Sequence, residues 1–195
     1  MNRQISLSQY RTIDLGILAL VQIFCQGLMY FAINLWFPEQ LYVASPVAGM
    51  AALVMMRWGP FAAIHAALGG LVYAWLSDGD WQHFLIYGIG NLAALAAAPV
   101  LVKLGKEKVR RSGFLSLMFG LMVQLLMQLG RALMALALGA SVQEGLGFFT
   151  TDVLSCILTL LIIWIVRKSD GLFEDQKHYL LRLDKERQAE RRDRF

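Results

Sequence analysis

The chain has 195 residues, of which 57% are hydrophobic and 16% are charged, and its mean hydropathy is +0.53. A soluble domain of this length could not bury so many apolar side chains in one core, and these numbers also exclude disorder over most of the chain. The formal net charge of +4 and the pI of about 9.2 allow a nucleic-acid partner until the basic residues are located.

The sequence lacks the common cofactor and catalytic motifs. Cys25 and Cys156 form no CxxC pair and no cluster with histidine, so neither a disulfide scaffold nor a zinc site is expected. His65, His83 and His178 fall at different depths of the predicted helices and do not make a bis-histidine haem site. No nucleophile elbow, P-loop, HExxH or GxGxxG motif occurs. We therefore expect no cofactor and no intrinsic catalytic activity, with any ATP hydrolysis carried out by separate subunits.

Six apolar segments predict an all-α, polytopic membrane protein with a compact bundle over residues 1–168. The first segment, 14–37, contains a charge-free run of 23 residues from Leu15 to Phe37. A helix needs about 20 such residues to cross the hydrocarbon core. The second and third segments are short and could instead form one broken hairpin. The other five segments are expected at 44–57, 60–77, 81–103, 112–139 and 145–167.

Local signals mark where these helices begin and how they pack. Ser45-Pro46 suits an N-cap followed by proline at the first helical position, and Asp80 and Ser112 stand where caps are expected for the fourth and fifth helices. Small residues spaced four apart permit close backbone approach between helices in lipid. Examples are Ala48/Ala52, Ala62/Ala66/Gly70 and Ala94/Ala98.

The composition changes after Val166, and residues 169–195 form a strongly charged tail. Asp170-Gly171 is expected to end the sixth helix. Beyond it we predict an amphipathic cytoplasmic helix that lies along the membrane surface or against a partner. Its narrow apolar stripe consists of Leu172, Tyr179, Leu180 and Leu183.

The basic residues predict the orientation of the chain. If the N-terminus is cytoplasmic, all but one of the 18 lysines and arginines fall on the cytoplasmic side, and the opposite side carries only acidic residues. We therefore expect a multi-pass protein of the bacterial plasma (inner) membrane with both termini in the cytoplasm. The net positive charge is then explained by the orientation of the chain and by contact with anionic lipids of the bilayer. A nucleic-acid partner is not needed to explain it.

The exception is Arg131, inside the fifth predicted span. A charge at mid-helix costs about 2.5–3.5 kcal/mol on insertion, so it should face the bundle interior or a water-filled cavity. Polar residues on neighbouring helices lie at a similar depth, and aromatic residues gather toward the outer ends. This pattern predicts a small-molecule pocket that opens outward. The predicted substrate-binding residues are Arg131, Gln128, Asp152, Asn91, Trp81, Tyr42 and Phe148.

Two interpretations of Arg131 remain open at this point. Its planar guanidinium suits a substrate carboxylate or phosphate. Alternatively, Arg131 and Asp152 neutralise each other, because charges inside membranes commonly pair. Both hold if a ligand competes for the pair.

The chain resembles the substrate-binding S component of an energy-coupling factor (ECF) transporter, a bacterial vitamin-uptake system. The resemblance covers about residues 10–168 and rests on size, six predicted spans, and the stretch WGPFAAIHAALGGLVYAWL from Trp58 to Leu76. It implies capture of a vitamin-like substrate at the outer face, between the first loop and the outer halves of helices four to six. It also implies docking on a transmembrane coupling subunit with two cytoplasmic ATPases, and toppling in the membrane to release substrate.

Other classes of function are compatible with the same residues. A cell-shape type of scaffold would use the bundle and the basic tail to bind protein partners, with Arg131 and Asp152 as an internal staple. A sensor would need an output domain after the tail. A membrane enzyme would need a convergent acid, base or metal cluster.

Overall fold

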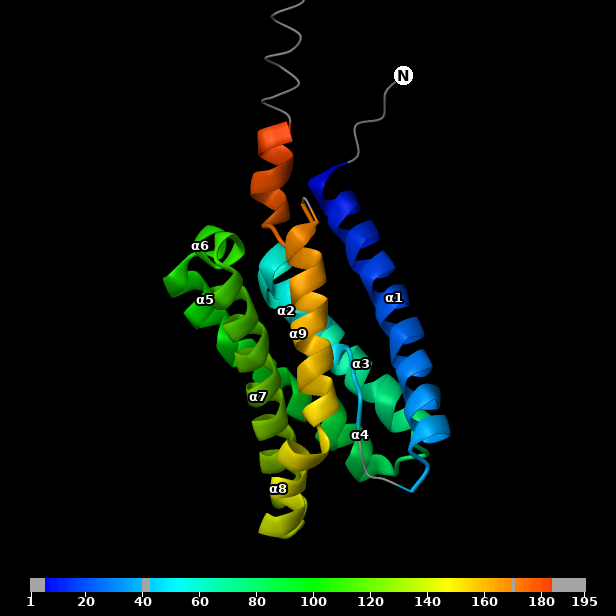
Figure 1. Cartoon of the computed structure of the whole chain (residues 1–195). Coiled ribbons are helices and arrows are strands. Elements are labelled where there is room, and N and C mark those ends of the chain that lie inside the picture. The colour runs from blue at the N-terminus through cyan, green and yellow to red at the C-terminus, as the bar shows by residue number, and fades with distance from the viewer. Residues whose placement is uncertain (1–5, 40–42, 170, 184–195) are drawn as a thin grey trace, which may run out of the picture.

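The computed structural model describes residues 6–39, 43–169 and 171–183, and every regular element in these ranges is helical (Figure 1). The predicted all-α class is therefore confirmed. A further helix covers 176–183. The elements are α1 (Leu7–Trp36), α2 (Val47–Trp58), the 3-10 turn η1 (Gly59–Phe61), α3 (Ala62–Leu76), α4 (Trp81–Gly88), the 3-10 segment η2 (Gly90–Ala97), α5 (Ala98–Leu104), α6 (Lys106–Arg111), α7 (Gly113–Ala137), α8 (Val142–Thr151) and α9 (Val153–Lys168).

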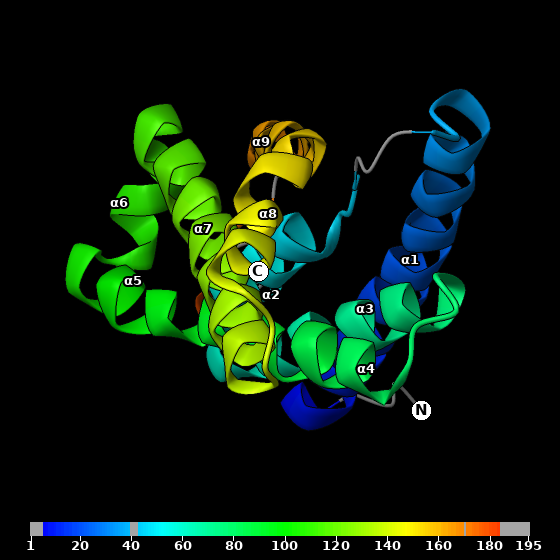
Figure 2. The ribbon, with the colours of Figure 1, turned by 90° about the horizontal axis from the view of Figure 1, so that it is seen from below.

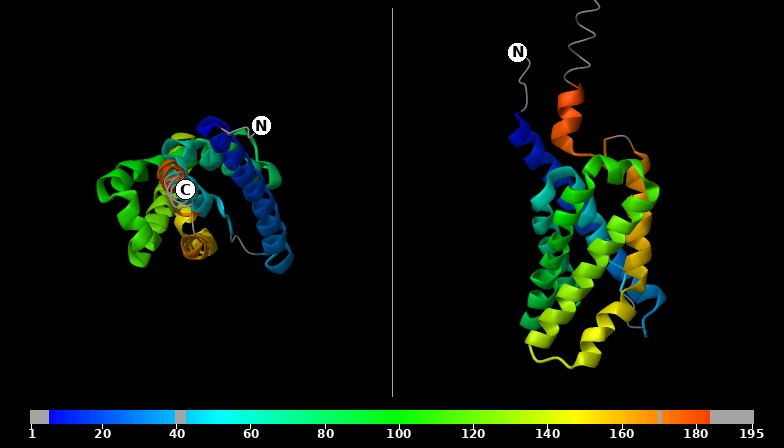
Figure 3. Two further views of the ribbon diagram at one scale, coloured as in Figure 1. Left: turned by 90° about the horizontal axis from the view of Figure 1, so that it is seen from above. Right: turned by 90° about the vertical axis from the view of Figure 1, so that its left-hand side faces the viewer.

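The bundle is elongated and has two distinct ends. The start of α1, η1, α6 and residues 171–183 lie at one end, which we call the tail end (Figures 1 and 3). The opposite end, the loop end, holds the turns that precede α4 and α8. The helix 176–183 points away from the bundle rather than lying across its end (Figure 3). The rest of the predicted tail helix, 184–195, lies outside the described residues.

Four segments are long and apolar enough to cross a membrane: Leu7–Trp36, Val47–Leu76, Trp81–Leu104 and Gly113–Ala137. A fifth is present if α8 and α9, which meet at a 42° bend, are counted as one span. These helices indicate a multi-pass membrane protein. The six separate spans predicted from the sequence are not confirmed.

The difference arises in the second candidate segment, which folds back on itself. Gly59 has φ +60 and breaks the helix. A Cβ built on Gly69 would overlap the side chain of Val47, although a continuous helix would hold these residues about 33 Å apart. Val47–Leu76 is therefore an antiparallel hairpin of α2 and α3. Because α2 is only about 18 Å long, it is too short to cross a hydrocarbon core of about 30 Å alone.

The short helix α2 forms the centre of the bundle. It packs against α1, α3, α7 and α9, and it lies between them when the molecule is seen end-on (Figure 2). Every residue from Val47 to Arg57 is buried. The segment that leads into α2 is bonded to the α8–α9 junction: Val43 N–H donates to the Thr151 carbonyl of α8, and Ser45 N–H donates to Ser155 Oγ of α9.

The helix predicted over 81–103 is interrupted by η2, a 3-10 segment of eight residues. Runs of 3-10 helix longer than three or four residues are uncommon. Here the segment lies in backbone contact with α7. A Cβ on Gly90 would come within 2.9 Å of Arg131 Cα, and a Cβ on Gly130 would overlap the Gly90 carbonyl. These glycines allow the close approach that brings Arg131 onto η2.

A second buried arginine closes the tail end. Arg57 is 5% exposed and donates two hydrogen bonds to the Asp14 carboxylate, at 2.6 and 2.9 Å. It also donates to the carbonyls of Gly171 and Leu172. Phe173, which follows directly, is 1% exposed. Arg57 therefore joins α1, α2 and the start of the tail.

Gly130→Ala should lower the free energy of unfolding by about 1–3 kcal/mol, because the added methyl overlaps backbone that cannot rotate away. The matched control is Gly16→Ala in α1, where nothing lies within 4 Å. That change should stabilise the protein by about 0.5–1 kcal/mol, because alanine favours the helix. Thermal unfolding of the detergent-solubilised protein measures both. Equal shifts in melting temperature would contradict the proposed η2–α7 contact.

Candidate functional site

The guanidinium of Arg131 is the centre of a buried polar cluster. Its Nε donates to Asn91 Oδ1 at 2.6 Å and its Nη1 donates to Asp152 Oδ2 at 2.7 Å. Arg131 and Asp152 are each 2% exposed and Asn91 is fully buried. Within the described part of the chain, Nη2 is the guanidinium nitrogen that makes no hydrogen bond. The structure therefore shows the predicted ion pair, with one donor group of the arginine left over.

The carboxylate of Asp152 accepts from side chains on two helices besides Arg131. Gln124 Nε2 donates to Oδ2 at 3.3 Å, and Ser155 Oγ donates to Oδ1 at 3.2 Å. Asp152 stands at the bend between α8 and α9, where the first turn of α9 begins. This position turns its side chain toward α7. The bend is therefore the local feature that places a carboxylate opposite Arg131.

Asn91 fixes the other side of the guanidinium. Its Oδ1 accepts from Arg131, and its Nδ2 donates to the Ala66 carbonyl of α3 at 3.0 Å. Because both ends of the amide are engaged, its orientation is set by its partners. The arginine is held through hydrogen bonds that link α3, η2, α7 and the α8–α9 bend.

Aromatic rings line the loop-end side of the cluster. Arg131 Cζ lies 4.9 Å from the ring centroid of Tyr87, which favours a cation–π contact. Tyr87 packs against Tyr73 of α3 with a centroid separation of 4.6 Å and edge-on against Phe148 of α8 at 6.0 Å. His83, one turn nearer the loop end, stacks on Tyr87 at 6.4 Å. Since α7 ends about 9 Å beyond Arg131, these rings lie between the arginine and the loop-end surface.

Hydrogen bonds continue from this cluster to α1. Ser155 Oγ accepts from Ser45 N–H at 2.9 Å, and Ser45 Oγ donates to Gln26 Oε1 at 2.8 Å. One turn away on α1, Gln22 donates to the His65 carbonyl at 2.7 Å. Gln22 and Gln26 are the buried residues of α1, so polar contacts hold the most enclosed part of this helix, while Leu15 and Leu18 pack against the apolar core.

The structure brings together most of the residues predicted for the substrate site. Arg131, Asp152 and Asn91 are bonded to one another, and Phe148 joins them through Tyr87. Gln128 is buried on the same face of α7, with its amide 3.8 Å from Cys156 Sγ. Trp81 is 63% exposed at the start of α4 and does not join the cluster. Tyr42, the remaining predicted residue, lies outside the described residues.

Four residues of the cluster were not among those predicted: Tyr73, Tyr87, Gln124 and Ser155. Tyr87 stands four residues before Asn91, and Ser155 stands three residues after Asp152. Residues at these spacings share a helix face, so helical periodicity around the predicted polar residues identifies both of them. Tyr73 has no such signal, because its position depends on how the α2–α3 hairpin folds back.

The cluster has the chemistry of an anion-binding or structural site. In the part of the chain that the structure describes, no group of three or more His, Cys, Asp or Glu side chains could hold a metal ion. The arginine supplies a fixed positive charge and N–H donors, and the tyrosines supply flat apolar faces with hydroxyl groups. Such groups can bind a planar anion, or they can hold four helices together.

The ion pair should show strong coupling in a double-mutant cycle. Arg131→Met strands a buried carboxylate and should lower the free energy of unfolding by about 3–5 kcal/mol. Adding Asp152→Asn should recover most of this loss, because the neutral amide keeps partners in Gln124 and Ser155. Thermal or denaturant unfolding in detergent gives the four stabilities. Additive effects of the two substitutions would show that the pair is not coupled.

Comparisons with known protein families, with curated proteins and with solved structures each found no match for the chain.

Proposed function

We propose that the chain is the membrane-embedded, substrate-binding subunit of an uptake system, of the S-component type. It takes a small, vitamin-like anion and works with a transmembrane coupling subunit and two cytoplasmic ATPases. The observation that carries the proposal is Arg131, a buried arginine with Nη2 unbonded in the described structure and an aromatic cluster beside it.

The burial of Arg131 supports a ligand with a negative charge. A charged group inside a membrane bundle needs compensation, and Asp152 supplies one negative charge. A ligand carboxylate or phosphate that reached the guanidinium would compete with Asp152 for it and would find Nη2 unbonded. The rings of Tyr87, Tyr73 and Phe148 favour a ligand whose remaining part is flat and apolar.

The distribution of charge supports the proposed orientation in a bacterial inner membrane. Apart from Arg131, the lysines and arginines of the described residues belong to elements at the tail end. The acidic residues Glu39, Asp78, Asp80 and Glu144 belong to the loop end. By the positive-inside rule, the tail end faces the cytoplasm and the loop end faces outward. The aromatic side of the cluster then faces the compartment from which a nutrient is captured.

A scaffold function is the second candidate, and one observation favours it. Arg131 is already satisfied in part by Asp152 and Asn91, as an internal staple would be. The helix 176–183 projects from the bundle and could then bind a protein partner (Figure 1). A scaffold needs the cluster for stability alone, whereas a binding subunit also loses its ligand when the cluster is altered.

Arg131→Lys separates these two functions. Lysine keeps a positive charge opposite Asp152 and so preserves folding, but it lacks the planar fork with which arginine can bond Asn91, Asp152 and a ligand at once. The full chain is purified from cells, and small anions released on denaturation are quantified by mass spectrometry. We expect wild-type protein to retain an anion and Arg131→Lys to bind it about ten- to a hundredfold less tightly, as for the loss of one charge-assisted hydrogen bond.

The matched control is Arg182→Lys, an identical change at an exposed arginine of the helix 176–183, outside the cluster. It should leave retention of the anion unchanged. If neither wild type nor variant carries an anion, while both unfold at similar temperatures, the substrate-binding proposal is wrong and the scaffold is favoured.

A further inference from the structure

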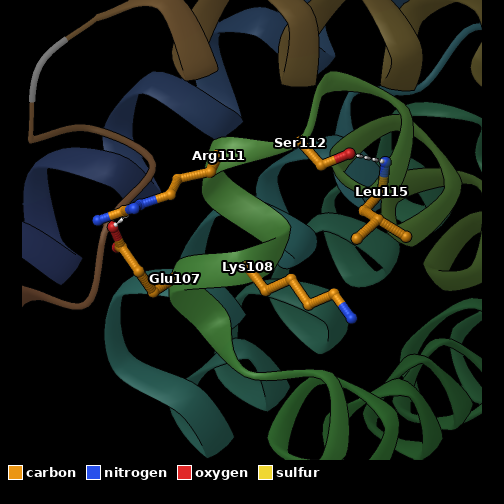
Figure 4. Close-up of a pocket in the computed structure, with 5 residues that line it drawn as sticks. All are labelled: Glu107, Lys108, Arg111, Ser112 and Leu115. Carbon is orange, nitrogen blue, oxygen red and sulfur yellow. Dashed lines mark hydrogen bonds and ion pairs between the residues drawn. The ribbon is translucent and has the colours of Figure 1, made fainter.

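A surface hollow of about 640 Å³ lies at the tail end of the bundle. Figure 4 shows the side chains that line it, none of which belongs to the Arg131 cluster. It is lined by Glu107, Lys108, Arg111, Ser112 and Leu115, which span the junction of α6 and α7. All five come from one stretch of chain, residues 107–115, and no other element that the structure describes closes the hollow on the side that faces away from the bundle. The candidate membrane span Gly113–Ala137 begins within this stretch. The hollow is therefore at the level where the bilayer's headgroups meet its hydrocarbon.

The two cations that line the hollow, Arg111 and Lys108, differ in whether they already form an ion pair. Arg111 donates from Nε to Glu107 at 2.6 Å, but its side chain is 77% exposed. Lys108 is exposed and makes no hydrogen bond or ion pair with any described residue. Figure 4 shows the Arg111–Glu107 pair on one side and Lys108 extending on the side of Leu115. Both side chains line the hollow from opposite sides, so an anion bound between them is flanked by a positive charge on each side.

Ser112 adds a neutral donor between these charges. Its Oγ accepts from Leu115 N–H as the N-cap of α7, which leaves the hydroxyl hydrogen available to donate. The start of α7 carries the positive end of the helix dipole, and this favours a negative group at the same place. Two cations, a hydroxyl and a helix start together match the oxygen atoms of a phosphate diester.

Below the hollow, the exposed face of α7 is apolar. Met118, Leu125 and Leu129 are 42%, 51% and 45% exposed, and they share a helix face with Leu115. This stripe extends about 21 Å from Leu115, which exceeds the roughly 15 Å of hydrocarbon in one leaflet. A ligand held in the hollow by its charge can therefore lay an acyl chain along α7. A free phosphate would use only the polar part.

We propose that the hollow between α6 and α7 binds the phosphodiester headgroup of an anionic phospholipid, with Lys108, Arg111 and Ser112 as the contacts. The lipid's acyl chain follows the stripe from Leu115 to Leu129. Glu107 opposes binding, because its carboxylate occupies Arg111 and repels the phosphate. This site is independent of the substrate proposed at Arg131, and either assignment can fail without the other.

Glu107 is ionised when the lipid binds. The hydrogen bonds from Arg110 and Arg111 lower the pKa of its carboxyl to about 2, so it carries a negative charge at neutral pH. Glu107→Gln removes this charge and releases Arg111 from its ion pair. The variant should therefore hold an anionic lipid more tightly than the wild type, which a purely structural role for Glu107 does not predict.

The test uses the full chain in detergent with equal amounts of phosphatidylglycerol and phosphatidylcholine, followed by native mass spectrometry of the retained lipid. Wild type should retain phosphatidylglycerol in preference to phosphatidylcholine. Lys108→Gln and Arg111→Gln should each reduce that preference about fivefold. Glu107→Gln should increase it. The matched control is Lys103→Gln, which removes the same charge from an exposed lysine of α5 outside the hollow.

Any of the following three results would overturn the proposal. If Lys103→Gln reduces the preference as much as Lys108→Gln does, the attraction belongs to the basic surface in general and not to the hollow. If excess inorganic phosphate displaces phosphatidylglycerol completely, the hollow takes a soluble anion. Equal retention of both lipids by wild type excludes a headgroup site. Melting temperatures, expected to be unchanged because these side chains are exposed, confirm that the variants are folded.

Discussion

The arrangement of the bundle depends on the compensation of one buried charge. Arg131 cannot stay inside an apolar bundle without partners, and its partners come from different parts of the chain: Asn91 in η2 and Asp152 at the α8–α9 bend. Asn91 in turn holds the Ala66 carbonyl of α3. The distorted backbone of η2 and the bend at Asp152 are both departures from regular helix, and both place a polar group against the guanidinium. The need to compensate the buried charge of Arg131 therefore accounts for both the irregular segment η2 and the bend at Asp152.

The two buried arginines have different roles, and the sequence distinguished only one of them. Arg131 was identified because it interrupts an apolar span. Arg57 ends a short helix beside Gly59-Pro60, and in the sequence it is simply one more basic residue on the predicted cytoplasmic side. In the structure it binds Asp14 and two tail carbonyls. Its partners are 43 and more than 110 residues away. Neither Asp14 nor the tail carries a local pattern that predicts this contact, because only the tertiary fold brings them together.

Composition and periodicity predicted the helical class and two of the helix caps, since apolar runs and capping residues are local properties. Asp80 and Ser112 cap α4 and α7 as expected. The number of spans was not predictable in the same way. Length alone cannot distinguish two short spans from the α2–α3 hairpin, whose geometry depends on burial of α2 by α7 and α9. In the site, Arg131, Asp152 and Asn91 were predictable from their charge or polarity inside apolar spans. Tyr73 was not, because it approaches Tyr87 only through that hairpin.

The burial of α2 has a consequence for how the chain enters a membrane. A helix of 12 residues that carries Arg57 is too short to partition into a bilayer by itself. It is expected to enter together with α3 as one hairpin. Its charge partner Asp14 on α1 and its polar neighbour Ser155 on α9 come from opposite ends of the sequence. Since α7 and α9 follow α2 during synthesis, two of the surfaces that bury α2 do not exist until these helices are made. The last helices thus complete the enclosure of a segment synthesised near the beginning, and truncation before α9 would expose the centre of the bundle to quality-control proteases.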